Sequence, residues 1–205
     1  MTRERVEASL GAAYESLPED AACGREVYRG KVRDVVAGKE SLLLVASDRI
    51  SAFDRILSTV PFKGELLTRV AAFWFAATKD IVPNHVIAGP GELPGTGRAC
   101  LARKAEMLPL EVVVRGYLTG SAWRDYTAAK PISGISLPGG LRYNEKFPVP
   151  IITPSTKEAS GHDRPVSSAE FVSSGLVGEV LWREVVRVSL AVVRKGEELA
   201  AAAGV

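Results

Sequence analysis

Hydrophobic residues are grouped along this chain into short blocks that predict several β-strands. Polar residues, Gly or Pro bound each block, as is typical of strands. We expect strands at residues 25–36, 41–47, 99–107 and 110–116. Gly38 and Lys39 separate the first two blocks, which predicts that these strands form a β-hairpin.

A second pattern, apolar residues three or four positions apart, predicts helices elsewhere in the chain. We expect longer helices at residues 2–17, 64–79 and 178–202. The second of these places five apolar residues on one face, namely Leu67, Val70, Ala71, Trp74 and Phe75. A short helix is expected at residues 119–128. Ser167 and Glu170 form a capping-box pattern that begins another helix, and Gly204 is predicted to follow the last helix as its C′ residue.

The remaining segments predict loops and a division of the chain into two lobes. Residues 131–165 are rich in Pro, Gly and polar side chains, so we expect a long loop there. A loop of this length in a compact protein is usually functional or disordered. Residues 107–109 connect two predicted strands and predict a hinge between a β-rich N-terminal lobe, residues 1–108, and a C-terminal lobe, residues 109–205.

Composition narrows the classes of protein to which this chain belongs. Of its 205 residues, 46% are hydrophobic and 24% are charged, which is ordinary for a soluble globular protein. The net charge of +2 is too small to favour binding to nucleic acid or to an anionic membrane. Cys23 and Cys100 lie far apart and form no metal-binding or redox spacing. Few cysteines and no apolar signal segment predict a cytoplasmic protein.

The stretch YRGKVRD contains two cations inside a predicted strand. Residues two apart on an extended strand point to the same side, so Lys31 and Arg33 would share one face. Two cations on one face repel each other unless an anion or water lies between them. One hypothesis is a clamp for polyphosphate, in which Gly30 lets the backbone approach closely. The alternative is a solvated edge strand.

A second cation follows a run of valines. Arg115 comes directly after residues 112–114, which we expect to be buried, and an arginine there needs an anionic partner. Gly120 and Ser121 begin a predicted helix and offer backbone N–H groups and a hydroxyl to a phosphate. These residues indicate a phosphorylated small molecule. The alternative is a capped helix beside a structural salt bridge.

Two further segments carry polar side chains in predicted loops. ASDRISAFD, residues 46–54, follows a buried strand and contains Asp54, which suits either a functional loop or a surface loop with a local ion pair. Residues 150–163 contain Lys157, His162 and Asp163 in a segment that we expect to contact a substrate. His162 beside Asp163 is weak evidence for acid–base catalysis, because adjacent side chains on an extended chain diverge.

Four blocks together resemble one family. YRGKVRD, LLLVASDRISAFD, VVVRGYLTGSAWRDY and FPVPIITPSTKEASGHD, in this order and spacing, are similar to phosphoribosylaminoimidazole-succinocarboxamide synthases, the SAICAR synthetases of purine biosynthesis. The resemblance implies an α+β, two-lobed fold related to ATP-grasp and kinase-like enzymes, with ATP between the lobes. It implies an ATP-dependent ligase that joins L-aspartate to carboxyaminoimidazole ribotide.

The resemblance also implies roles for particular residues. The cations that match those holding the ATP phosphates are Lys31 and Arg33. The residues that match the segment around the adenine are Lys104, Met107 and Glu111. On the substrate side, Arg115 and Ser121 match residues that hold the ribotide phosphate and its neighbouring groups, and the other matching positions are Asp54, Lys157 and Asp163.

ATP and Mg²⁺ are the cofactors that the resemblance implies, and no metal ligand is assigned within these 205 residues. The family pattern is expected to continue past Val205, with a C-terminal part that supplies carboxylates for Mg²⁺. Two alternatives to the ligase are an inactive nucleotide- or ribotide-binding remnant and a kinase-like phosphotransferase for small molecules. We expect no nucleic acid and no membrane as partners, and a homo-oligomer is left open.

Overall fold

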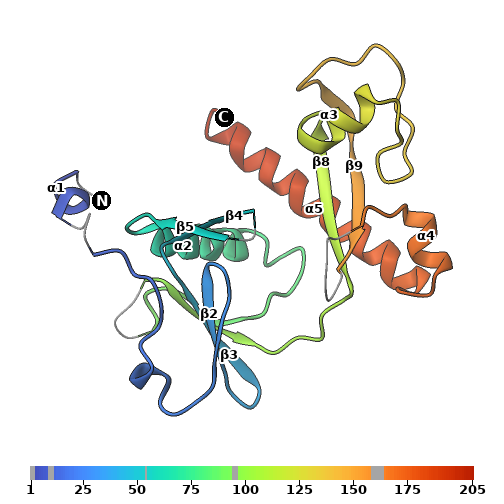
Figure 1. Ribbon diagram of the computed structural model, residues 1–205. Helices are drawn as coiled ribbons and strands as arrows, with labels where there is room; N and C mark the ends of the chain where they lie inside the picture. Colours follow the sequence, from blue (N-terminus) through green and yellow to red (C-terminus); the bar gives the residue numbers. More distant parts are fainter. Residues whose placement is uncertain (1–2, 9–11, 54, 94–96, 158–163) are drawn as a thin grey trace. The chain divides into compact units, whose positions relative to one another are not determined.

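The chain forms two compact units, which are described separately. A computed structural model describes residues 3–8, 12–53, 55–93, 97–157 and 164–205 (Figure 1). Unit 1 comprises Met1–Glu106 and unit 2 comprises Met107–Val205. No helix in the described parts of either unit is both long enough and apolar enough to cross a membrane.

Unit 1 is built on a five-stranded antiparallel sheet. Its strands, in spatial order, are β1 (Val27–Arg29), β2 (Arg33–Ala37), β3 (Ser41–Ala46), β7 (Ala99–Arg103) and β6 (Val86–Ala88). The predicted hairpin around Gly38 is confirmed, and the Gly38 N–H donates to Ser41 O at 2.8 Å. β7 is shorter than the predicted strand 99–107, so Lys104 and Met107 lie in the connection that follows it.

The predicted single strand at residues 25–36 is wrong. β1 and β2 form a second hairpin, in which Arg29 pairs with Asp34 and the Gly30 N–H donates to Arg33 O at 2.8 Å. A Cβ atom added to Gly30 would lie only 2.9 Å from Arg33 O, so a glycine fits this tight turn. We expected Gly30 to let the backbone approach a ligand closely. In the structure, Gly30 lets the backbone approach Arg33 of the same hairpin.

Two further predictions for unit 1 are corrected. The segment 46–54, expected to be a loop, contains the strand β4 (Arg49–Ala52), which pairs with β5 (Arg55–Thr59) beyond it. The helix expected at residues 2–17 is described only as α1 (Arg3–Ala8), and residues 12–17 are not helical. A 3₁₀ turn, η1 (Asp20–Ala22), follows. Short strands and turns of this kind are determined by tertiary contacts, which the local pattern of hydrophobic and polar residues does not reveal.

The two faces of the five-stranded sheet are covered by different segments. On one face, Leu17 and Ala22 form a core with Val36, Val45 and Ala99. The helix α2 (Lys63–Ala77) packs against β3 and β7. Its first turn approaches β3 so closely that a Cβ atom on Gly64 would lie 2.4 Å from Ala46 O. Only glycine permits this approach.

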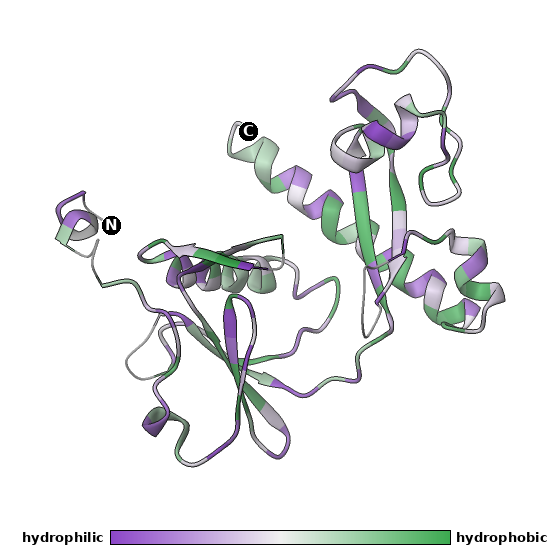
Figure 2. Cartoon of the chain, viewed as in Figure 1, coloured by the Kyte–Doolittle hydropathy of each residue, from purple (hydrophilic) through white to green (hydrophobic). Residues whose placement is uncertain are grey.

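The apolar face predicted for α2 is not buried as expected. Leu67 and Val70 are about half exposed, and so are Leu66 and Phe73 on the same helix. Figure 2 shows the hydropathy of the residues along α2. The helix is apolar around most of its circumference, and spacing alone does not identify the packed face of such a helix.

Unit 2 contains a two-stranded antiparallel sheet of β8 (Leu110–Tyr117) and β9 (Lys146–Thr156). β8 agrees with the predicted strand, whereas β9 lies inside the predicted loop 131–165. Pro148, Pro150 and Pro154 obscure the strand pattern. They are tolerated because each strand of a two-stranded sheet is an edge, where a missing N–H need not break a ladder.

The described residues of unit 2 also form three helices: α3 (Gly120–Thr127), α4 (Ser168–Ser173) and α5 (Glu179–Ala202). The capping prediction is confirmed, because Ser167 Oγ accepts the Glu170 N–H at 3.1 Å. Gly204 has φ +78°, and its N–H donates to Ala201 O while the Val205 N–H donates to Ala200 O. This is the Schellman pattern expected of a C′ glycine.

Apolar side chains form two cores in unit 2. One surrounds Leu118, Ala122, Ile132 and Phe147, between α3 and the strands. The other joins Val166 and Phe171 to Val177 and Trp182, with Leu110 and Val112 of β8 packed against it. One face of β8 is thereby buried, and strand alternation turns Glu111, Val113 and Arg115 to the other face.

Candidate functional site

The two cations of YRGKVRD do not lie as the sequence predicted. Lys31 is in the turn between β1 and β2, and Arg33 is the first residue of β2, so strand alternation does not relate them. Both side chains are exposed. The two cations therefore lie at an exposed hairpin tip, one on the turn and the other at its base, and their binding of a polyphosphate stays a prediction.

Beneath this tip lies an ion pair that the sequence analysis missed. Asp34 is fully buried, and its Oδ1 accepts a hydrogen bond from Arg49 Nη2 at 2.8 Å. Asp34 Oδ2 accepts the Leu17 N–H at 2.7 Å and lies 3.5 Å from Arg29 Nη1. The sequence did contain a sign of this ion pair, because Asp34 is directly followed by the apolar residues Val35 and Val36. A carboxylate buried beside them requires a charged partner.

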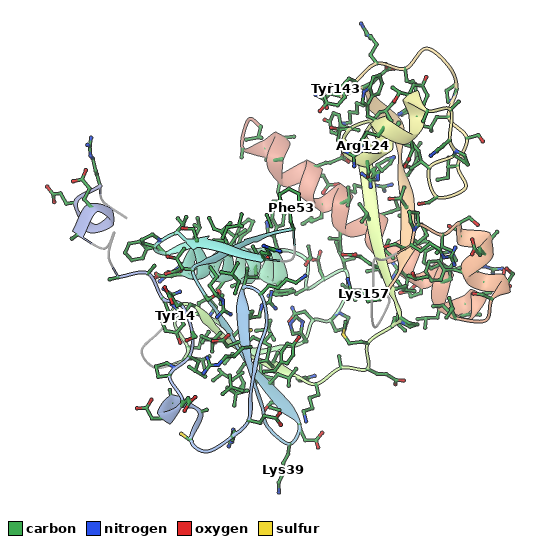
Figure 3. All side chains as sticks on the ribbon, in the orientation of Figure 1. Tyr14, Lys39, Phe53, Arg124, Tyr143 and Lys157 are labelled. Atoms are coloured by element: carbon green, nitrogen blue, oxygen red, sulfur yellow. The ribbon has the colours of Figure 1, made fainter. Side chains whose placement is uncertain are left out.

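A second buried carboxylate, Asp48, joins three parts of unit 1. Its carboxylate accepts the Tyr14 N–H at 2.8 Å, the Gly64 N–H at 2.9 Å and Arg98 Nη1 at 2.9 Å. The Arg98 guanidinium also lies over the Tyr14 ring, 4.5 Å from its centroid; Tyr14 is labelled in Figure 3. Phe62, the N-cap of α2, makes no side-chain cap, so Asp48 supplies an acceptor for the first turn of the helix.

The hydrogen bonds of Asp48 determine its ionisation. Burial acts to raise the pKa of this carboxyl, but hydrogen bonds from Arg98, Gly64 and Tyr14 outweigh burial and lower the pKa below its usual value. Asp48 is therefore an ionised structural anchor at neutral pH.

Unit 1 also contains a cavity of about 190 Å³. Its wall is mostly apolar and includes Leu44, Ala72, Phe75 and Val86, from β3, α2 and β6. Three cations also line it, namely Arg33, Lys63 and Arg98. Its volume is below the roughly 300–1,000 Å³ of sites that enclose a whole ligand, so it suits a ring-sized group.

Cys100 forms part of the wall of this cavity. Burial raises the pKa of its thiol, although Arg33 acts in the opposite direction. The thiol is therefore protonated at neutral pH and contributes a small apolar surface.

In unit 2, the structure brings two predicted substrate residues together. Arg115 Nη2 donates to Ser121 Oγ at 3.1 Å, and Arg115 Nε donates to Thr153 Oγ1 at 3.1 Å. Thr153 Oγ1 in turn donates to Val113 O at 2.9 Å, which fixes its rotamer. Arg115 is on β8, Ser121 is on α3 and Thr153 is on β9. The result is a cation flanked by two hydroxyls on one face of the sheet. The valines before Arg115 are not buried as predicted, because Val112 and Val114 are only partly buried and Val113 is exposed.

A second pair lies farther along the same face. Lys157 Nζ is 3.6 Å from a Glu111 carboxylate oxygen, and both side chains are more than half exposed. Lys157 is labelled at the end of β9 in Figure 3. At about 3.4 Å per residue, the Glu111 and Arg115 backbones are roughly 13 Å apart along β8. The two groups are therefore neighbours on one surface without direct contact.

The other predicted site residues stand apart from these groups or outside the described residues. Met107 is 84% exposed, and the Lys104 N–H donates to Glu40 O at 3.1 Å in the connection after β7. Asp54, His162 and Asp163 lie outside the described residues. Across the described parts of the chain, no group of three or more His, Cys, Asp or Glu side chains is placed to hold a metal ion.

These features define an α+β protein of two units, with basic and hydroxyl-bearing groups suited to phosphorylated small molecules. The SAICAR synthetase family model matches residues 26–205. The chain therefore belongs to the SAICAR synthetase family.

Similar proteins support this assignment. The chain is 43% identical over 188 residues to a phosphoribosylaminoimidazole-succinocarboxamide synthase from Thermodesulfovibrio yellowstonii, a match that covers 86% of this chain and 64% of that protein. It is 44% identical over 184 residues to the protein of the same name from Bacteroides thetaiotaomicron, covering 88% and 57%. A solved SAICAR synthase from Saccharomyces cerevisiae, complexed with SAICAR, has a TM-score of 0.80 at 36% identity and covers 92% of this chain and 67% of that one.

The chain thus spans less than two thirds of the length of these two bacterial relatives. The matched part contains both the hairpin tip of unit 1 and the Arg115 group of unit 2.

Proposed function

We propose that this chain carries the nucleotide- and ribotide-binding parts of an ATP-dependent ligase that joins L-aspartate to carboxyaminoimidazole ribotide, giving SAICAR in purine biosynthesis. The observation that carries the proposal is the family match over residues 26–205, which includes every residue to which we assign a role. The cytoplasm is the compartment expected for this pathway.

In the proposed reaction, the ribotide carboxylate attacks the γ-phosphorus of ATP, and ADP leaves. The resulting acyl phosphate is attacked at its carbonyl carbon by the aspartate amine. An amide bond forms, inorganic phosphate leaves and the amine loses a proton. Such a sequence depends on positioning and charge neutralisation more than on a protein nucleophile.

The nucleotide phosphates are assigned to unit 1, where Lys31 and Arg33 would meet them at the hairpin tip. Lys104, Met107 and Glu111 are proposed to contact the adenine. The cavity next to Arg33 supports binding of an apolar ring in this unit.

The ribotide is assigned to unit 2. Arg115 would pair with its phosphate while Ser121 donates a hydrogen bond, and Thr153 would hold the guanidinium in place. Lys157 of the same unit is proposed to contact this substrate as well. Asp54 and Asp163 are proposed as further substrate contacts. Arg115 already bonds two neutral hydroxyls, so an anion would gain a charged partner without separating an ion pair.

Mg²⁺ accompanies ATP as the counterion of its phosphates. The described residues supply no group of carboxylates that fits this ion, so we assign no residue of this chain to it and derive no step through it.

The test is ADP release by the 205-residue protein, measured with ATP, ribotide and aspartate together and with each omitted. The ligase predicts release that requires both ribotide and aspartate. Release without aspartate would instead identify a kinase-like phosphotransferase. Binding of ATP or ribotide with no release would identify a binding remnant and contradict activity of this chain as it stands.

A further inference from the structure

Three consecutive carbonyl groups in the turn between β1 and β2 are held from one side. Gly30 O accepts Arg49 Nη2 at 2.8 Å, and Lys31 O accepts Arg49 Nε at 3.2 Å. Val32 O accepts both the N–H of Ser47, at 3.0 Å, and its hydroxyl, at 2.9 Å. The peptide planes that follow Gly30, Lys31 and Val32 therefore have fixed orientations.

The fixed carbonyls also orient the N–H groups of the turn. None of the described residues has a cis peptide bond, and the C=O and N–H of a trans peptide unit point in opposite directions. Holding the Gly30 and Lys31 carbonyls toward Arg49 therefore turns the N–H groups of Lys31 and Val32 to the opposite side. Successive N–H groups in a turn form a concavity that attracts anions.

Arg49 is itself immobilised below the turn. Its side chain is 8% exposed and forms an ion pair with Asp34, which is completely buried. The other terminal nitrogen of its guanidinium, Nη1, donates to Glu15 O at 2.7 Å. A planar guanidinium can hold several acceptors in fixed directions at once, whereas a lysine ammonium presents a single rotatable group.

We propose that Arg49 is a positioning residue that orients the 30–32 turn for a nucleotide phosphate. Asp34 holds the guanidinium, the guanidinium holds the carbonyls of Gly30 and Lys31, and the N–H groups of the turn face the phosphate. The inference rests on the proposed function, because the anion is taken to be the polyphosphate of ATP.

The experiment compares ATP with adenosine, which lacks phosphates, as ligands of the full 205-residue chain in calorimetric titrations. Arg49→Gln should lower the affinity for ATP by about tenfold, equivalent to one or two lost hydrogen bonds, and leave the affinity for adenosine unchanged. A purely structural role would lower both affinities together.

Arg29→Gln is the matched control. Arg29 also lies beside Asp34, at 3.5 Å, but it donates to Leu17 O and to none of the three turn carbonyls. Its replacement removes the same charge from the same carboxylate. We expect the ratio of the ATP to adenosine affinities to stay within about twofold of the wild type, as for an exposed, screened charge.

Two further variants keep the test decisive if Arg49→Gln does not fold. Arg49→Lys retains the charge opposite Asp34 but cannot hold both carbonyls, and Ser47→Ala removes one bond to Val32 O; each should reduce the preference for ATP. Unchanged preference in all folded Arg49 and Ser47 variants would overturn the inference. A wild-type protein with no preference for ATP over adenosine would instead overturn the proposed role of the turn, and the inference with it.

Discussion

At the scale of single residues, Asp48 shows how one carboxylate supports a whole unit. It accepts hydrogen bonds from Tyr14, Gly64 and Arg98, so it connects the N-terminal segment, the start of α2 and the beginning of β7. These bonds lower its pKa against the opposing effect of burial. Asp48 therefore contributes to stability only while it is ionised.

This dependence predicts a pH effect. A carboxyl whose pKa is lower in the folded state stabilises the protein fully above its unfolded pKa of about 3.9, and this stabilisation is lost as the pH falls through the folded pKa. Asp48→Asn should cost about 3 kcal/mol at pH 7, because Arg98 loses its buried partner. The free energy of unfolding of the variant, measured by urea titration from pH 7 to 2, should fall less steeply with acid than that of the wild type.

Asp80→Asn is the control for this prediction, since Asp80 is an exposed carboxylate in the turn that follows α2. Its acid dependence should match that of the wild type. An Asp48→Asn curve parallel to the wild-type curve would contradict the role assigned to Asp48.

Among the residues of the candidate site, Arg115 was identified from its local sequence, whereas the Asp34–Arg49 ion pair was not. Arg115 after three valines predicted an arginine that needs an anionic partner. The structure instead places it against the neutral hydroxyls of Ser121 and Thr153, so its pairing with a phosphate stays a prediction. The pair Asp34 and Arg49 was missed, because its members are 15 residues apart and only the packing of two hairpins brings them together. Local spacing contains no information about that contact.

At the scale of elements, the placement of α2 depends on the absence of a side chain at Gly64. A Cβ atom there would lie 2.4 Å from Ala46 O and 2.8 Å from Ala46 C, and both belong to backbone that cannot rotate away. The helix start and the end of β3 must therefore separate if the residue grows.

We predict that Gly64→Ala destabilises the protein by about 1–3 kcal/mol, even though alanine favours helix. Thermal unfolding followed by circular dichroism measures the effect. Gly139→Ala is the matched control, because a Cβ atom at that position meets no atom within 4 Å. An equal change for both variants would show that close packing at Gly64 has no special cost.

Elements with a clear apolar block or a capping signal were predicted well. The hairpin at Gly38, the start of α4 at Ser167 and the C′ glycine of α5 all follow from local chemistry. β9 was missed because its prolines are typical of loops, and only its pairing with β8 shows that it is a strand. The turn at Gly30 was missed because a single glycine inside a segment rich in β-branched and aromatic residues also fits a continuous strand.

At the scale of the whole molecule, the chain divides between Glu106 and Met107. Residues 104–107 are exposed and lie outside regular secondary structure. Unit 1 has an apolar core around Val36 and Val45, and unit 2 has two, one around Leu118 and one around Phe171. The connection at residues 104–107 is therefore an exposed backbone segment, accessible to proteases, between two units with separate cores.

We predict that brief treatment of the native protein with a glutamate-specific protease cleaves after Glu106 early and yields fragments that correspond to the two units. Mass spectrometry identifies the cleavage site. Glu106→Gln should abolish these fragments, whereas Glu198→Gln, within the long helix α5, should leave them unchanged. First cleavage inside either sheet would contradict the division described above.

The bonds of Asp48 have a further consequence for how unit 1 folds. Its three partners lie 34, 16 and 50 residues away along the chain, so these bonds form only after several long loops have closed. We expect contacts of such high sequence separation to form late, on the native side of the folding barrier. The hydrogen bonds of Asp48 should therefore mainly slow the unfolding of unit 1. Their loss would raise the unfolding rate more than it would lower the folding rate.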